Sequence, residues 1–146
     1  MAENQLSVGE KLSRLLSREY AYYASCRYYQ RNFRGRALTD FGDILLKNLT
    51  ASEERSALLN RYCNMFGLPA PKTACTECIG SMGETLPDAS KPGEALVKLT
   101  AIQTVIVDEA TQLTQELGEY PFVTHGLMGI INKVMNERLQ LQMISG

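Results

Sequence analysis

Four glutamates have the clearest potential for chemistry in this sequence, because each is spaced as part of the apolar stripe of a helix. Glu19 follows Leu15 by four residues, and Glu109 follows Ile106 by three, so each acid shares a helix face with an apolar neighbour. The pattern places one such acid on each of four predicted helices: Glu19, Glu54, Glu109 and Glu137.

Four carboxylates in one core would repel each other and lose their hydration, which is costly unless they are protonated, paired or bound to a cation. A metal ion would resolve that conflict, and facing helices of a bundle commonly hold metals through carboxylates. The second helix leaves Glu53 open as the alternative to Glu54. Another interpretation also stays open, in which the acids reach water at the stripe edge or pair with Arg18, Arg55 or Arg138.

The period of apolar residues is helical nearly everywhere, so we expect an all-α fold. Capping residues, glycines and prolines set the ends of four helices. The predicted limits are Val8 to Gly35, with Ser7 and Glu10 as a capping box, Thr39 or Asp40 to Gly67, Pro92–Glu94 to Gly118, and Pro121 or Thr124 to the end of the chain.

Connection lengths predict how these helices are arranged. Short links make the first and second helices, and likewise the third and fourth, antiparallel neighbours. The stretch 69–92 is rich in Pro, Gly, Thr, Ser and Cys and is long enough to cross the whole bundle. We therefore predict a four-helix bundle of two antiparallel hairpins joined by a long crossover, which is the ferritin-like arrangement.

Composition narrows the function classes. A chain of 146 residues fits a single domain, 1–146, and a net charge of −1 gives no field that would favour nucleic acid as a partner. The polar N-terminus and the lack of a long apolar run predict a soluble, cytoplasmic protein with no membrane partner. The single His excludes any site that needs two imidazoles from one chain.

Three short segments resemble the ferritin-like superfamily, bacterioferritins and mini-ferritins in particular. Leu15–Tyr20 is similar to the first ferritin helix, and the resemblance implies that Glu19 is an iron ligand. Tyr29–Gly35 resembles the end of that helix in mini-ferritins, with Gln30 in place of the ligand His. Ser52–Arg55 is similar to the second-helix Glu-Glu-Arg segment, which implies ligation by Glu54, and Gly67-Leu68-Pro69 closes that helix as in bacterioferritins.

Both Glu-x-x-His motifs of the family lack their histidine in this chain. They become Glu54-Arg55-Ser56-Ala57 and Glu137-Arg138-Leu139-Gln140. The ligand set implied by the resemblance is therefore all oxygen: Glu19, Glu54, Glu109 and Glu137, with the amide of Gln140 in place of an imidazole. The implied metal is iron, with manganese or zinc as alternatives. The implied function is iron oxidation, storage or detoxification, with an activity of the ferroxidase type. The resemblance also implies a homo-oligomer.

Two other functions compete with metal oxidation. The first is a structural or interaction bundle whose metal site is degenerate and whose acids are protonated or paired. The second depends on Cys75-Thr76-Glu77-Cys78, whose Cys-x-x-Cys spacing is compatible with a redox pair, half of a zinc site, or an incidental pair of thiols.

Overall fold

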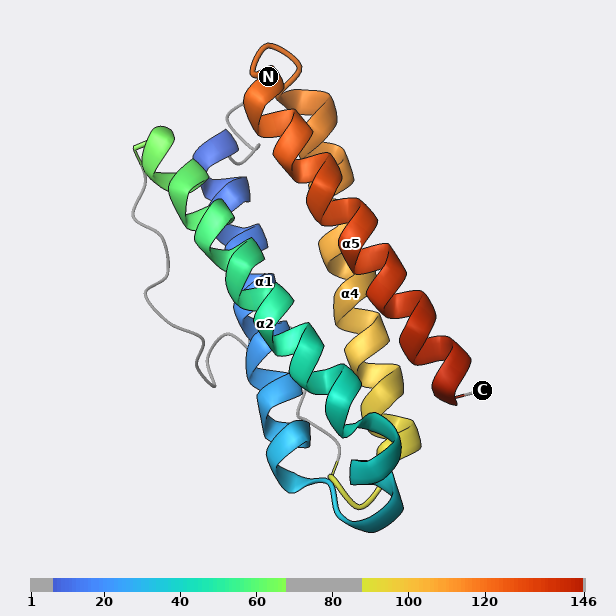
Figure 1. Ribbon diagram of the computed structural model, residues 1–146. Coiled ribbons are helices and arrows are strands. Elements are labelled where there is room, and N and C mark those ends of the chain that lie inside the picture. The colour runs from blue at the N-terminus through green and yellow to red at the C-terminus, as the bar shows by residue number, and fades with distance from the viewer. Residues whose placement is uncertain (1–6, 68–87, 146) are drawn as a thin grey trace.

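The protein is all-α, as the helical period predicts. In the computed structural model, residues 7–67 and 88–145 are described, and no strand occurs within these ranges. The four helices are α1 (Val8–Asn32), α2 (Gly35–Met65), α4 (Pro92–Glu116) and α5 (Pro121–Ser145), which lie side by side as a bundle (Figure 1).

The bundle consists of two antiparallel hairpins, α1 with α2 and α4 with α5, and the prediction of that topology is confirmed. Helix α1 also packs on α4, where Lys11 forms an ion pair with Glu116, and α2 packs on α5. Helices α2 and α4 run in the same direction, so the end of α2 and the start of α4 lie at opposite ends of the bundle (Figure 1). The connection between the hairpins therefore spans the length of the molecule.

The first helix begins where its capping residue predicts. The hydroxyl oxygen of Ser7 accepts a hydrogen bond from the backbone N–H of Glu10 at 3.1 Å, and the hydroxyl donates to the Glu10 carboxylate at 3.1 Å. This satisfies one of the free donors at the helix N-terminus. The start of α4 at Pro92 and of α5 at Pro121 agrees with the preference of proline for the first helical turn.

The predicted start of the second helix at Thr39 or Asp40 is wrong, because α2 already begins at Gly35. Gly35 adopts φ +58°, a left-handed conformation that lets the chain reverse within two residues after α1. The two polar side chains find partners inside the helix instead of capping it. Thr39 donates to the Gly35 carbonyl at 3.3 Å, and Asp40 lies 3.4 Å from Arg36.

The end of α2 agrees with the predicted glycine stop. Gly67 has φ +75°, and the N–H groups of Phe66 and Gly67 bond back to carbonyls of the last turn. Leu68 and Pro69, the rest of the predicted stop, lie outside the described residues.

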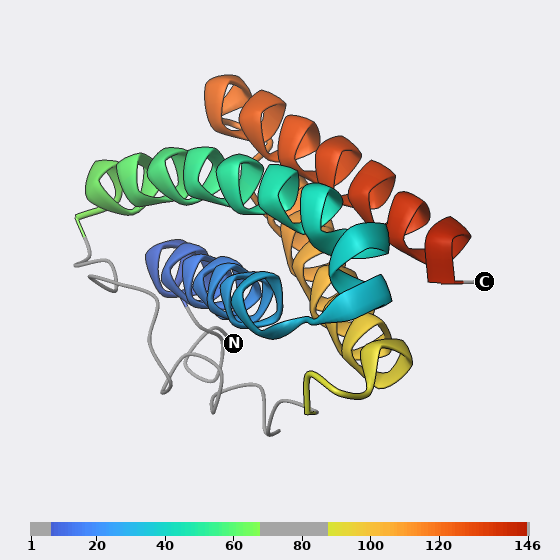
Figure 2. The same cartoon turned by 60° about the horizontal axis from the view of Figure 1, so that its bottom comes forward.

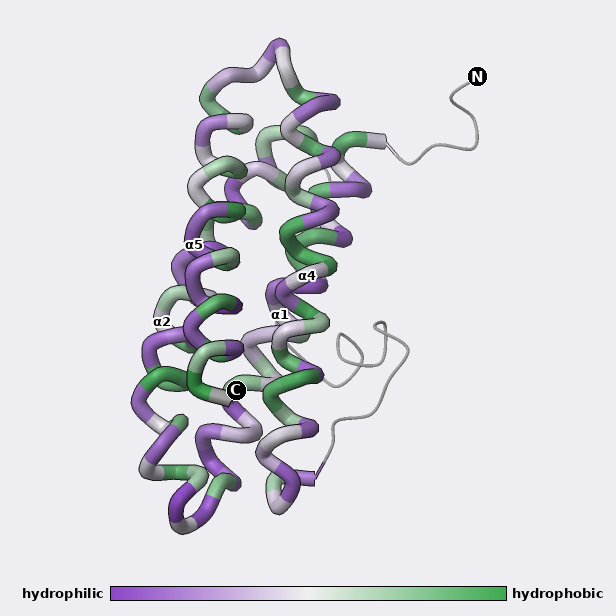
Figure 3. The backbone as a smooth tube through the Cα atoms, turned by 90° about the vertical axis from the view of Figure 1, so that its right-hand side faces the viewer, coloured by the Kyte–Doolittle hydropathy of each residue, from purple (hydrophilic) through white to green (hydrophobic). Residues whose placement is uncertain are grey.

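The core consists of one continuous cluster of leucines, isoleucines, valines and aromatic rings from all four helices. Hydrophobic and hydrophilic segments alternate along each helix in Figure 3, as expected for helices with one apolar face. Gly126 of α5 lies against Tyr62 of α2, and a Cβ at Gly126 would lie 1.8 Å from the Tyr62 hydroxyl. None of the described helices is long and apolar enough to cross a membrane.

Candidate functional site: a buried glutamate–arginine network

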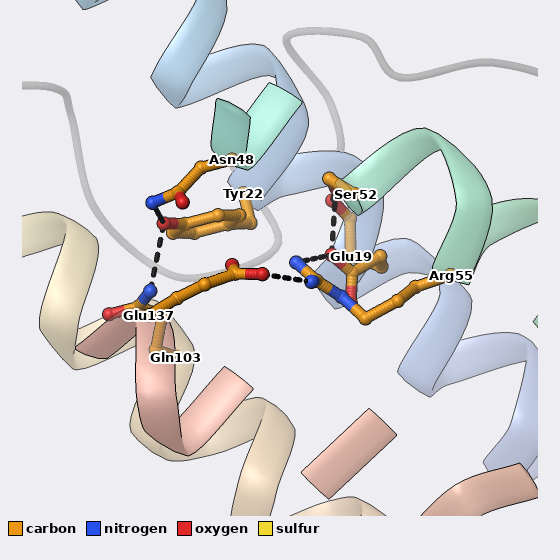
Figure 4. Close-up of polar contacts among 7 residues, drawn as sticks. All are labelled: Glu19, Tyr22, Asn48, Ser52, Arg55, Gln103 and Glu137. Atoms are coloured by element: carbon orange, nitrogen blue, oxygen red, sulfur yellow. Dashed lines mark hydrogen bonds and ion pairs between the residues drawn. The ribbon is translucent and has the colours of Figure 1, made fainter. Parts of the chain in front are cut away.

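Arg55 of α2 lies between the fully buried carboxylate of Glu19 and that of Glu137, whose side chain is 12% exposed (Figure 4). Its Nη2 is 2.8 Å from Glu19 Oε1 of α1, and its Nη1 is 2.6 Å from Glu137 Oε2 of α5. Glu19 is fully buried, and the Arg55 side chain is 2% exposed. Ser52, one helical turn before Arg55, donates to Glu19 Oε1 at 2.7 Å. We call Glu19, Arg55 and Glu137 the triad.

A neutral polar cluster lies beside the triad, centred on the fully buried Tyr22. The Tyr22 hydroxyl accepts hydrogen bonds from Asn48 Nδ2 of α2 and from Gln103 Nε2 of α4, both at 2.8 Å. The hydroxyl also shares a hydrogen bond with the thiol of Cys26, one turn further along α1. Together with the triad, these side chains connect all four helices by hydrogen bonds through the core.

Burial and charge shift the pKa values of these groups in different directions. Burial alone would lower the pKa of Arg55, but the carboxylates of Glu19 and Glu137 raise it above its ordinary value. Burial raises the pKa of Glu137, although Arg55 acts against that shift. Burial likewise raises the pKa values of Tyr22 and Cys26, so the phenol and the thiol stay protonated at neutral pH.

Several buried polar atoms in and beside the triad have no hydrogen-bond partner. Glu19 Oε2, Glu137 Oε1 and Gln103 Oε1 are buried without a hydrogen-bond partner, as is the donor Arg55 Nε. With both acids ionised, the triad carries two negative charges and one positive charge. A proton on Glu137 would neutralise the remaining charge and add a donor, which agrees with the direction of its pKa shift.

The structure brings together two of the five predicted metal ligands, Glu19 and Glu137. Glu109 lies at the α1–α4 edge, 21% exposed, with Arg14 Nε at 3.6 Å and Arg18 Nε at 3.4 Å. Gln140 of α5 is exposed and lies outside the core. Glu54 of α2, the fifth predicted ligand, is also outside the core.

The inward orientation expected for Glu54 is wrong, because this residue is exposed, as is its alternative Glu53. The prediction aligned Glu54 with Leu58, which is only partly buried. The fully buried stripe of α2 is shifted by about one residue and runs through Asn48, Ser52, Arg55, Leu59 and Tyr62.

No group of three or more His, Cys, Asp or Glu side chains is arranged to hold a metal in residues 7–67 and 88–145. The thiols of Cys26 and Cys63 are free and buried. Cys75 and Cys78 lie outside the described residues, so the hypothesis of a thiol or zinc site there stays a prediction.

The sequence analysis named Arg55 only as one of three partners for the acids and gave no role to Asn48 or Gln103. The signal that could have found them is a run of polar residues at core spacing on α2. Asn48, Ser52 and Arg55 follow one another at intervals of four and three, and Leu59 continues the series. Such a run predicts a helix face that buries polar groups, and therefore a hydrogen-bonded network.

Arg55 occupies the position between the acids that the sequence analysis gave to a metal. A guanidinium offers two parallel donors to carboxylates and keeps its charge at any physiological pH. The network can therefore hold the four helices in one register without a bound cation. Comparison of the chain with protein-family models, curated proteins and solved structures found no match.

Proposed function

We propose that this chain is a non-enzymatic structural or interaction bundle, in which Arg55 neutralises buried acids that would otherwise need a metal. The observation that carries the proposal is the position of the Arg55 guanidinium, within 2.8 Å of Glu19 and 2.6 Å of Glu137. A metal ion at the triad would compete with Arg55 for the carboxylates of Glu19 and Glu137, and it would be repelled by the buried positive charge.

The helix register on α2 supports the same proposal. If the chain is ferritin-like, the second helix should present a Glu-x-x-His pair to the core. The inward residues three apart at the level of the triad are Ser52 and Arg55, whereas Glu54 and Ala57 are exposed. A hydroxyl and a guanidinium thus take the two inward positions, and neither is a suitable ligand for iron.

The second candidate is ferritin-like metal binding, with iron oxidation, storage or detoxification. Three buried oxygens without a hydrogen-bond partner favour it: Glu19 Oε2, Glu137 Oε1 and Gln103 Oε1. All three are hard ligands, suited to manganese or to iron held weakly. Binding would require Arg55 to leave the core, where its side chain is 2% exposed.

Metal titration separates the two candidates. Fe(II), under anaerobic conditions, or Mn(II) is added to the full chain, and bound metal and the midpoint of thermal unfolding are measured. We expect no stoichiometric binding and no shift of the midpoint, because anything that binds only the folded state raises that midpoint. Zn(II) is measured separately, with the wild type and with Cys75→Ser/Cys78→Ser.

The double variant Glu19→Gln/Glu137→Gln removes the two core acids, and Glu53→Gln/Glu54→Gln removes two exposed acids as the matched control. About one or more Fe(II) per chain, lost in the first variant and kept in the second, would overturn the proposal in favour of the metal candidate. Zinc binding that disappears with Cys75 and Cys78 would instead assign a metal role to the Cys-x-x-Cys segment.

A further inference from the structure

Helix α5 carries two heptad-like seams on opposite faces. The inner seam packs into the core and consists of Val123, Leu127, Ile130, Val134, Glu137 and Leu141. The outer seam consists of His125, Met128, Asn132, Met135, Leu139 and Gln142, and every one of these residues is exposed. Steps of three and four residues alternate along both seams, which is the spacing of a helix that pairs with another helix on each side.

The outer seam has the composition of an interface rather than that of a solvated helix face. Of the exposed α5 residues that the structure describes, only Lys133 carries a full charge at neutral pH. Met128 is 56% exposed, and Leu139 is 54% exposed. Interface cores are depleted in charged residues and enriched in Met. The exposed positions of α2, in contrast, include both acids and bases.

We propose that the outer seam of α5 binds the outer seam of a second copy of this chain, in an antiparallel, two-fold symmetric pair. A two-fold axis between residues 132 and 135 places Asn132 opposite Met135 of the other copy and matches like with like on either side of this central pair. Met128 then meets Leu139 of the other copy, and His125 meets Gln142 of the other copy. Outside the central pair, the seam is therefore complementary to itself, as the interface of a symmetric dimer is.

The position of α5 leaves this seam accessible. Figure 2 shows α5 at the edge of the bundle, with one side turned away from the other three helices. Arg138, on the flank of the seam, is held inside its own bundle by a 2.9 Å hydrogen bond to Thr104. The approach of a second α5 therefore does not bring the Arg138 charge into the interface.

The helix dipole favours the antiparallel direction. Helix α5 has no acidic residue in its first turn and no basic residue in its last turn, so its own side chains do not compensate the dipole. A parallel pair would place two positive N-termini side by side, whereas an antiparallel pair places each N-terminus beside a C-terminus.

Sedimentation equilibrium of the full chain tests the pairing. We expect a mass of twice 16.3 kDa at high concentration, with dissociation in the micromolar range, because an interface of one helix is small. Leu139→Asp, and independently Met135→Lys, should raise the dissociation constant about 100-fold or more, since each buries a charge twice in the pair.

Leu46→Asp is the matched control, because Leu46 of α2 is a leucine 52% exposed outside the seam. It should dimerise like the wild type. Circular dichroism verifies that each variant is helical. A wild type that stays monomeric up to about 500 μM would overturn the proposal. So would equal weakening by Leu46→Asp and Leu139→Asp.

Cross-linking tests the direction. In a Cys75→Ser/Cys78→Ser background, Met128→Cys chains are mixed with Leu139→Cys chains and oxidised. The antiparallel pair predicts a disulfide between unlike chains only, because two copies of residue 128 would be about 16 Å apart along the helix axis. Cross-linking of Met128→Cys alone would overturn the antiparallel geometry. Neither experiment involves the triad, so the pairing is tested independently of the proposed function.

Discussion

Arg55 is the side chain that compensates the negative charges of Glu19 and Glu137. A buried ion pair is weak evidence for stability as a whole, because desolvation offsets the attraction between the charges. Removing one member is different, since it leaves the other charges buried without compensation. Among the residues described, Arg55 is the sole cation bound to Glu19 and Glu137 by direct hydrogen bonds. Its removal would therefore leave both carboxylates without a compensating charge.

We predict that Arg55→Met lowers the free energy of unfolding by about 3–5 kcal/mol, measured by urea denaturation. Arg55→Lys keeps the positive charge but cannot donate to both carboxylates with the geometry of a guanidinium, so its free energy of unfolding should fall by less. Arg61→Met, at an exposed position of α2, is the control and should change the free energy by less than about 0.5 kcal/mol. The triple variant Glu19→Leu/Arg55→Met/Glu137→Leu should recover much of the loss. An Arg55→Met variant with an unchanged free energy of unfolding would contradict the role given to the guanidinium.

Glu137 makes stability depend on pH in a direction opposite to that of most paired acids. Its pKa is raised in the folded protein by burial, so the folded state binds more protons than the unfolded state between the ordinary pKa of Glu and the raised value. Relative to Glu137→Gln, the wild type should therefore gain stability as the pH falls from 7 towards about 4.5. Urea denaturation of both proteins at several pH values measures this difference. A wild type that loses stability relative to the variant would mean that Arg55 lowers the pKa of Glu137 overall.

The residues of the triad illustrate what sequence could predict about the site. Glu19 and Glu137 were found because an acid on an apolar stripe is conspicuous. Glu54 was misplaced because Leu58, used as its reference, is itself only partly buried. A shift of one residue turns a helix face by about 100°, so the error exchanged Arg55 and Glu54 between core and surface.

At the scale of the helices, the contact between α2 and α5 depends on Gly126. This residue sits inside α5, where alanine would ordinarily be favoured by about 0.5–1 kcal/mol. The hydroxyl of Tyr62, 1% exposed, occupies the space that a side chain would need. The glycine is thus explained by close packing rather than by backbone conformation.

We expect Gly126→Ala to lower the free energy of unfolding by about 1–3 kcal/mol, as overpacking does, because the Tyr62 ring must move. Gly93→Ala is the control, since a Cβ at Gly93 meets nothing within 4 Å, and it should leave stability unchanged or slightly raised. The double variant Gly126→Ala/Tyr62→Phe should recover part of the loss. Equal effects at both glycines would contradict the packing argument.

Helix boundaries show why some elements are predictable and others are not. Ser7, Pro92, Pro121 and Gly67 act through local chemistry, so the sequence alone placed the ends near them. The start of α2 escaped prediction because Gly35 was assigned to the end of one helix, whereas it also begins the next. Phe33, in the two-residue link between these helices, is fully buried, and its ring centroid lies 6.2 Å from that of Phe41 in α2.

At the scale of the whole molecule, the bundle has buried charges in its interior and an outer α5 seam without charged residues. If the outer seam pairs two copies, folding and association are linked, because the pair exists only between folded chains. The midpoint of thermal unfolding should then rise with protein concentration, as mass action requires. We expect this dependence for the wild type and for Leu46→Asp, and its absence for Leu139→Asp, in scanning calorimetry over a range of at least about 100-fold in concentration. A midpoint independent of concentration in all three proteins would mean that the seam does not pair. A dependence that persists in Leu139→Asp would mean that the chain associates through another face.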